Sequence, residues 1–257
     1  MLIFKLEKFS LLLIFLGFIS QASAVDWQKV ENLLIAKGGN PKALSHMKCF
    51  MDEYKSKAFA LKNPDNEWSN ARCFAKETLS LKNERFMTLI DYTLPATKPR
   101  LFLIDTKNNS VKSIGVGHGR FKSGYIRFRT SYQKNSTKWA KYFSNRPGSR
   151  APSSGFYFAG QEYEGKFGRS LIMHGLEPGI NDYACERAVV IHKHLLVSKK
   201  RAYVMSSGCP MVSRGEIDPL IDAIKGQQSG IKIEEAGGLI FIYGPREKAW
   251  QEGSCSL

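Results

Sequence analysis

The stretch Ser206-Ser207-Gly208-Cys209-Pro210-Met211-Val212 places a cysteine on tightly constrained backbone, directly after a short apolar run typical of a strand end. Gly208 permits a positive φ or a close approach by another group. Pro210 fixes φ and cannot donate a hydrogen bond. We therefore expect a turn that holds the sulfur of Cys209 at the end of a strand, beside free backbone N–H groups.

Upstream of this turn, Ala188-Val189-Val190-Ile191-His192 is typical of a buried strand that ends in a histidine. Two neighbouring strands could bring the imidazole of His192 to the thiol of Cys209, which is the geometry that a thiolate nucleophile needs. A lone cysteine is more often a small buried hydrophobe or half of a disulfide. The two residues alone therefore leave a catalytic and a structural interpretation open.

Further motifs carry a resemblance to a known family. They are Arg100-Leu101-Phe102-Leu103-Ile104-Asp105, Gly117-His118-Gly119, Phe143-Ser144-Asn145-Arg146-Pro147-Gly148-Ser149, Ser153-Ser154-Gly155-Phe156-Tyr157 and Gly175-Leu176-Glu177-Pro178-Gly179-Ile180-Asn181-Asp182. With His192 and Ser206-x-Gly208-Cys209, they resemble the L,D-transpeptidases, YkuD-type cysteine enzymes of bacterial cell walls. The likeness is greatest to the murein L,D-transpeptidase catalytic domain family, in which Gly-Cys-Pro-x-Val follows the serine.

The resemblance runs from about Phe86 to Tyr243, with some departures from the family pattern. Ser207 stands where the commoner pattern has a histidine, so any role of that histidine is lost or taken over. His194 and His174 are additions that the pattern does not explain.

The strand pattern agrees with the fold that this family implies. From Phe86 onward, short apolar runs are separated by turn residues. Ser213-Arg214-Gly215-Glu216 resembles a capping box before a helix that reaches Ile224. We expect a β-rich α+β fold, with a YkuD-like β-sandwich or barrel as catalytic domain and a small helical N-terminal extension.

The chain divides into three predicted parts: a signal peptide at 1–24, a helical extension at 25–84 and the catalytic domain at 85–257. Within the extension, apolar spacing and caps predict helices over 26–37 and 41–57. A third short helix is predicted over 68–79.

The first residues are typical of a secretory signal. Lys5 and Lys8 precede an apolar run over 9–19, and Ala22-Ser23-Ala24 is a small-x-small cleavage site. A retained anchor is the alternative, but the run is short for a bilayer span. We expect a mature protein that begins at Val25, is soluble without a stable membrane anchor, and is periplasmic or secreted.

The charge of the chain indicates an anionic partner. The formal net charge is +15, and residues 120–150 carry nine Lys or Arg and seven aromatic residues. Such a surface fits wall polymer, membrane or nucleic acid. The signal sequence argues against nucleic acid, which we do not expect as a partner. A solvated basic face and a surface for anionic glycan remain equally good interpretations.

Five cysteines in an oxidising compartment leave one free thiol unless two chains are bridged. If Cys209 is the free thiol, the others can form two disulfides. We expect Cys49 with Cys73 and Cys185 with Cys255, although four cysteines allow three connectivities.

A cysteine acyltransferase needs a thiolate, a base and an oxyanion site. Cys209 would supply the sulfur and His192 the base. The N–H groups of Gly208 and Cys209 are the candidate oxyanion donors. Ser206 could orient the imidazole or the loop, or be a plain turn serine.

The resemblance implies the peptidoglycan stem peptide as substrate. Cys209 would attack the carbonyl of the third residue and release the terminal D-alanine. An amine acceptor would then give a 3-3 cross-link, whereas water would make the protein an L,D-carboxypeptidase. Arginine holds carboxylates in a bidentate way, so arginines beside the site would suit the substrate. The candidate substrate-binding residues are His174, Arg146, Arg150, Ser154, Gly155 and His118.

Two other classes of function are weaker. His192, His194, His174 and Cys209 could form a zinc site, but carboxylate ligands are missing from the local pattern. The departure at Ser207 could instead indicate a non-catalytic wall-binding module, against which the presence of both His192 and Cys209 argues. We expect neither a metal nor a cofactor.

Overall fold

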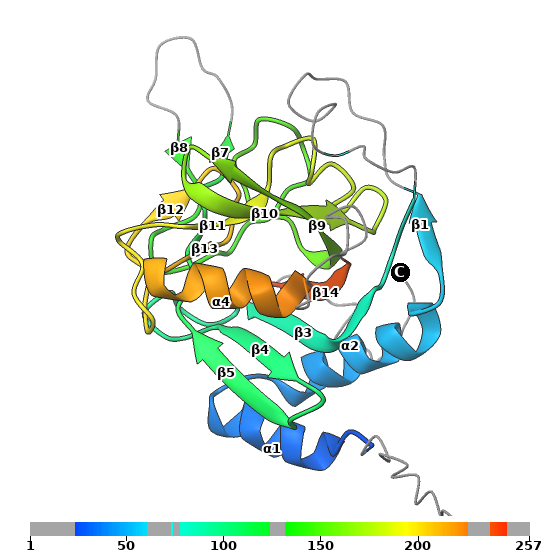
Figure 1. Cartoon of the computed structure of the whole chain (residues 1–257). Helices are drawn as coiled ribbons and strands as arrows, with labels where there is room; N and C mark the ends of the chain where they lie inside the picture. The colour runs from blue at the N-terminus through cyan, green and yellow to red at the C-terminus, as the bar shows by residue number, and fades with distance from the viewer. Residues whose placement is uncertain (1–23, 61–72, 74–77, 124–131, 226–236, 246–257) are drawn as a thin grey trace, which may run out of the picture.

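The computed structural model describes residues 24–60, 73, 78–123, 132–225 and 237–245 (Figure 1). The predicted signal peptide lies outside the described residues, except for Ala24. The third predicted helix lies mostly outside them as well. Its last two residues, Thr78 and Leu79, belong to a strand, so a helix that includes them is wrong.

An eight-stranded sheet forms the centre of the described structure. In spatial order its strands are β13 (Met211–Val212), β11 (Val190–Lys193), β10 (Gly168–Gly175), β9 (Gly155–Gly165), β14 (Gly238–Tyr243), β3 (Asn83–Asp91), β4 (Leu101–Asp105) and β5 (Ser110–Ile114). Strand β14 runs parallel to β3, and β13 runs parallel to β11. The other neighbours are antiparallel. The sheet is nearly closed and barrel-like, so the predicted β-rich fold with small N-terminal helices is confirmed.

Helices pack on both faces of the sheet (Figure 1). Helices α1 (Trp27–Ala36) and α2 (Pro41–Tyr54) bury their apolar residues in one cluster with β3, β4, β9 and β14. Helix α4 (Arg214–Lys225) lies against the other face through Ile217, Leu220, Ile221 and Ile224. The N-terminal helices therefore share a core with the sheet. A domain boundary at residue 84 stays a prediction.

The two N-terminal helices form where the sequence predicts them because both have side-chain caps. Asp26 accepts from the N–H of Lys29, and Asn40 accepts from the N–H of Lys42 ahead of Pro41. In α2, Phe50 stacks on Phe156 of the sheet with 4.0 Å between ring centroids. Truncating such a buried ring typically costs about 3–5 kcal/mol of stability, so this contact fixes the helix on the sheet.

Three two-stranded sheets lie outside the main sheet in the described residues. They pair β1 (Ala58–Ala60) with β2 (Thr78–Ser80), β6 (His118–Gly119) with β12 (Met205–Ser206), and β7 (Lys122–Ser123) with β8 (Tyr132–Gln133). The β6–β12 pair matters most for function because β12 leads directly into the cysteine turn.

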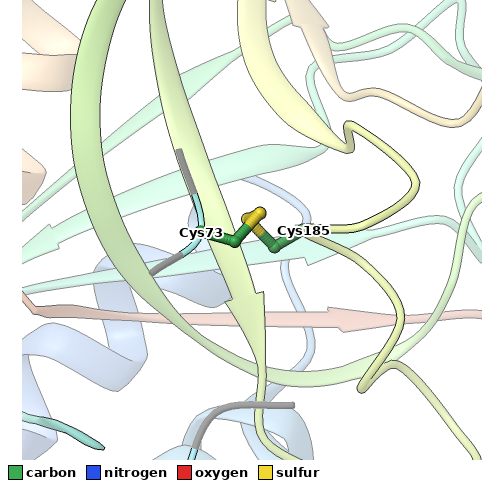
Figure 2. Close-up of a disulfide and its surroundings, with 2 residues drawn as sticks. All are labelled: Cys73 and Cys185. Carbon is green, nitrogen blue, oxygen red and sulfur yellow. A yellow bond between two sulfur atoms is a disulfide. The ribbon is translucent and has the colours of Figure 1, made fainter. Parts of the chain in front are cut away.

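The disulfide pairing differs from the prediction. Cys73 is bonded to Cys185, which joins the N-terminal part of the chain to the turns before β11 (Figure 2). Cys49 is disulfide-bonded too, and Cys209 is a free thiol. The expected pairs Cys49–Cys73 and Cys185–Cys255 are therefore wrong. Sequence spacing does not reveal that Cys73 lies against residues of β10 and β11.

Candidate active site

The cysteine turn is shaped by Ser206. Its hydroxyl donates to the carbonyl oxygen of Cys209, at 2.7 Å, and accepts from the N–H of Gly208, at 3.0 Å. Gly208 has φ +130, which only glycine adopts without strain. In this structure Ser206 orders the turn, and neither bond involves the imidazole of His192.

Glycines also allow the turn to pack closely against the chain below it. A Cβ on Gly119 would lie 2.7 Å from the Cα of Gly208 and 2.6 Å from the carbonyl oxygen of Arg150. A Cβ on Gly208 would lie 3.0 Å from the carbonyl oxygen of Ala151. Three segments therefore meet at the turn: β6, the chain at 150–152 and the turn itself.

The thiol of Cys209 is half-buried and donates to the carbonyl oxygen of Ala188, with 3.3 Å between sulfur and oxygen. Ala188 has φ +55, a left-handed conformation that costs a non-glycine residue about 1–2 kcal/mol. Burial raises the pKa of the thiol, while N–H groups and the cation of Arg187 lower it. The net shift is upward, so the resting sulfur is a thiol.

His192 lies on the same face of the sheet as Cys209. Val190 and His192 are two apart on β11, so their side chains point to the same face. Cys209 packs against the cluster that contains Val190 and Ile172. The N–H of His192 also donates to the carbonyl oxygen of Pro210, the residue that follows Cys209. The sheet therefore places His192 on the face against which Cys209 packs, and a backbone hydrogen bond links His192 to the residue after Cys209.

The imidazole of His192 is held in a defined position. Its Nδ1 lies 2.9 Å from the carbonyl oxygen of Lys193, and its ring stacks on Phe167 with 4.2 Å between centroids. A nitrogen facing a carbonyl oxygen carries the proton, which leaves Nε2 as the basic nitrogen. Burial lowers the pKa of His192, so a neutral imidazole accompanies the neutral thiol.

The N–H groups of the turn are not equivalent. The N–H of Gly208 is taken by Ser206, so it is not free to hold an oxyanion in this conformation. The N–H of Cys209 donates to no protein oxygen within the described residues. Of the two predicted oxyanion donors, the N–H of Cys209 is thus the one that no protein oxygen occupies, although it interacts with the sulfur of its own residue.

Two predicted substrate contacts lie in the core instead. His118 is fully buried, with Nδ1 2.7 Å from Arg100 Nη2 and Nε2 2.9 Å from the carbonyl oxygen of Ser136. Burial and the charge of Arg100 lower its pKa to about 3. His174, on β10, is also buried, and burial lowers its pKa to about 4. Neither residue presents its ring to solvent in this structure, and a substrate contact for either one stays a prediction.

Ser154 and Gly155 are buried where β9 begins. Asn181 Nδ2 donates to the carbonyl oxygen of Ser154, and Glu177 accepts from the N–H of Phe156. Gly155 has φ +95, and a Cβ there would lie 2.3 Å from the Glu177 carboxylate. The side chain of Ser154 is therefore enclosed, and Gly155 serves the close packing of Glu177.

Arg146 and Arg150 lie on a segment that we call the strap, residues 144–153. Both side chains are exposed. The strap runs beside the cysteine turn, because the carbonyl oxygen of Ala151 faces Gly208. The position is compatible with a substrate contact for either arginine. Part of the wider basic stretch, 124–131, lies outside the described residues.

Sequence reasoning missed Arg187, whose guanidinium lies behind the turn and contacts the strap. It also missed the buried Arg100, which donates to the carbonyl oxygen of Val116 and lies over the ring of Tyr92. No pattern of spacing identifies these residues. Arg187 is five positions before His192, which is the one signal that could have drawn attention to it.

The four residues considered as zinc ligands do not form a metal site. In the described part of the chain, no three His, Cys, Asp or Glu side chains are grouped as a metal site would require. Nor does any helix there have the length and apolar character needed to cross a membrane.

A half-buried cysteine and a buried histidine on one face of a barrel-like sheet are compatible with an enzyme that uses a cysteine nucleophile. The chain belongs to the YkuD_2 family, described as L,D-transpeptidase catalytic domain, whose family model matches residues 60–231. The resemblance seen in the sequence is thereby confirmed.

Several solved structures are similar, though only loosely. A variant of the helical cell shape determining protein Pgp2 from Campylobacter jejuni is 12% identical, with a TM-score of 0.39 and coverage of 82% of this chain and 60% of that one. Bd1075 from Bdellovibrio bacteriovorus is 15% identical, with a TM-score of 0.32 and coverage of 62% and 48%. An L,D-transpeptidase from Stackebrandtia nassauensis is 9% identical, with a TM-score of 0.30 and coverage of 84% and 77%.

The chain thus spans 60% of the length of the Pgp2 chain and about half that of Bd1075. No curated protein sequence matches it significantly. The family assignment rests on the family model.

Proposed function

We propose that the protein is a peptidoglycan L,D-transpeptidase that uses Cys209 as its nucleophile. Family membership supports an enzyme of this class. The observation that carries the proposal is the shared sheet face of Cys209 and His192, with His192 Nδ1 engaged by a backbone oxygen. That arrangement leaves Nε2 as the proton acceptor for a thiol.

The reaction begins with a neutral pair. When the donor tetrapeptide binds, His192 Nε2 takes the proton of the Cys209 thiol, and the sulfur attacks the carbonyl carbon of the third residue. The open N–H of Cys209 stabilises the oxyanion that forms. Collapse breaks the peptide bond to D-alanine, whose amine takes the proton from His192. The product is a thioester on Cys209.

An amine of a second stem peptide resolves the thioester. The amine attacks the thioester carbonyl, His192 accepts its surplus proton, and the thiolate of Cys209 leaves and is reprotonated. The new bond is a 3-3 cross-link. With water as the acceptor, the same steps would release a tripeptide, which is the L,D-carboxypeptidase outcome.

The proposed substrate requires an exported protein, so we place the mature chain in the periplasm or outside the cell. The basic start, short apolar run and Ala22-Ser23-Ala24 site support export. The net charge of +15 suits an anionic wall polymer as partner.

Incubation of the mature protein with tetrapeptide-bearing muropeptides tests the proposal, with products identified by mass spectrometry. We expect cross-linked dimers and free D-alanine from the wild type. Cys209→Ala should form neither product while keeping the wild-type melting temperature. Tripeptide without cross-linked dimers would establish L,D-carboxypeptidase activity instead. Full turnover by Cys209→Ala would overturn the nucleophile, and an inert wild-type protein that binds the substrate would indicate a wall-binding module.

A further inference from the structure

Arg187 is a largely enclosed cation that has only neutral partners. Nη1 donates to the carbonyl oxygen of Ser144, at 2.7 Å, and to Ser153 Oγ, at 3.3 Å. Nη2 donates to the carbonyl oxygen of Ala151, at 2.6 Å, and to Ser149 Oγ, at 3.2 Å. No carboxylate forms a salt bridge with it in the described part of the chain. Burying a cation without a paired anion costs free energy. We therefore expect the guanidinium to have a role that offsets this cost.

The guanidinium also lies beside the cysteine turn. Nη2 is 3.5 Å from the position that a Cβ on Gly208 would occupy, and Gly208 directly precedes Cys209. The same nitrogen contacts Ala151, whose carbonyl oxygen is the closest neighbour of that position. One planar group therefore holds the strap by hydrogen bonds and lies near the turn that carries Cys209.

We propose that Arg187 is a positioning residue for Cys209: its guanidinium fastens the strap to the turn and holds a fixed positive charge beside the sulfur. This inference rests on the proposed function for its catalytic meaning. An opposite charge nearby stabilises the thiolate relative to the thiol, while the fork geometry keeps the charge in place. The mutual electrostatic influence of Arg187 and Cys209 agrees with this arrangement.

His192, Tyr92 and Arg100 do not place a positive charge beside the sulfur. His192 lies on the same sheet face and is neutral, because burial lowers its pKa. Tyr92 is buried, its hydroxyl donates to the carbonyl oxygen of Gly117, and burial raises its pKa. The second buried cation, Arg100, faces Tyr92 and His118. Arg187 is thus the cation that acts directly on the thiol in the described structure.

The test measures the thiolate directly, without a wall substrate. The rate of alkylation of Cys209 by iodoacetamide is followed against pH in the intact, folded protein. Neutral replacements, Arg187→Met and Arg187→Gln, should raise the apparent pKa of the thiol by about one unit, as loss of a nearby opposite charge does. Gln keeps a hydrogen-bond donor for the strap, so it remains informative if the Met variant does not fold.

Arg187→Lys keeps the positive charge but loses the planar set of N–H donors that bonds to the strap. We expect its alkylation profile to stay near that of the wild type, while its melting temperature falls. Arg85→Met, which removes an exposed charge paired with Asp105, controls for net charge and should not move the profile. Unshifted profiles in both neutral variants, or equal shifts in the Lys and Gln variants, would overturn the inference.

The same set separates this inference from the proposed function. A shifted alkylation profile in the neutral variants, together with an absence of muropeptide turnover by the wild type, would support the positioning role of Arg187 and reject the transpeptidase function. Muropeptide turnover by the wild type, together with unshifted alkylation profiles in the neutral variants, would reject only the positioning role of Arg187.

Discussion

The backbone N–H of His192 donates to the carbonyl oxygen of Pro210, with 3.3 Å between nitrogen and oxygen. This bond belongs to the parallel pairing of β11 with β13. It fixes His192 relative to Cys209 through the backbone, because Pro210 follows Cys209 directly. Strand pairing therefore sets the relative position of the two segments that carry these residues.

His192→Ala should lower the rate of muropeptide turnover by about 10²–10⁴-fold, as removal of a general base does. His194→Ala is the matched control on the same strand end. His194 Nδ1 accepts from the N–H of Leu196 and thus supports the following hairpin. We expect a much smaller loss of rate from it. The opposite ranking in steady-state kinetics would move the base to His194.

The disulfide between Cys73 and Cys185 closes a loop with a sequence separation of 112. In the chain-entropy account, a loop of this length stabilises the folded state strongly. The double variant Cys73→Ser/Cys185→Ser should therefore lose about 2–5 kcal/mol in the free energy of unfolding. Urea denaturation under non-reducing conditions measures the loss.

Thiol counting provides the accompanying check. The denatured, unreduced wild type should show one titratable thiol, that of Cys209. Cys209→Ala should show none and should unfold at nearly the same urea concentration as the wild type. Three free thiols in the wild type, or an unchanged urea midpoint in the double serine variant, would contradict the structural role of this disulfide.

The local structure around Cys209 and His192 was predictable because local pattern limits where the two residues can lie. A glycine, a cysteine and a proline after an apolar run predict a constrained turn, and Val189 to His192 predict a buried strand. Pairing these segments required only that both lie in one sheet. The cap at Asp26 and the proline at position 41 likewise made the first two helices predictable.

The rest of the site depends on contacts between segments distant in sequence. Arg187 reaches residues 34 to 43 positions away, and no periodicity encodes those partners. His118 was predicted as a substrate contact because it lies in a family motif, yet it is buried between Arg100 and the backbone of Ser136. The pairing of Cys73 with Cys185 depends on the path of the chain, which cysteine spacing does not specify.

The exposed arginines of the strap suit the carboxylates of a stem peptide. Replacing Arg146 by Ala and Arg150 by Asn should raise KM about tenfold, as loss of one charge-assisted hydrogen bond would. Asn is used because Arg150 has φ +56, a conformation that Asn tolerates. The melting temperature should change little, since both side chains are exposed.

Lys107→Ala, which removes an exposed charge from the turn between β4 and β5, is the control for net charge. Kinetics at low ionic strength give the most sensitive comparison, because screening is weakest there. Wild-type kinetics in the double arginine variant would mean that the basic strap is a general adhesion surface.

Glu177 is the carboxyl group whose burial should appear in the pH dependence of stability. Burial raises its pKa from 4.5 to about 7, although the N–H of Phe156 opposes the shift. A carboxyl group with a raised folded-state pKa favours folding fully below about pH 4.5. That contribution is lost as the pH rises through about 7, because the folded state must then ionise a buried group. Glu177→Gln removes this titration and keeps an oxygen to accept from Phe156.

We therefore expect Glu177→Gln to gain stability relative to the wild type between pH 5 and pH 8, by on the order of 2 kcal/mol. Urea denaturation at both pH values measures the difference, and comparison with the wild type cancels the titration of the buried histidines. Glu164→Gln, at an exposed position on β9, is the matched control and should show the wild-type pH dependence. A constant difference between Glu177→Gln and the wild type across this range would show that Glu177 ionises as easily in the folded as in the unfolded protein. In that case the contact between Glu177 and Phe156, which holds the start of β9 beside the strap, would be that of an ordinary carboxylate.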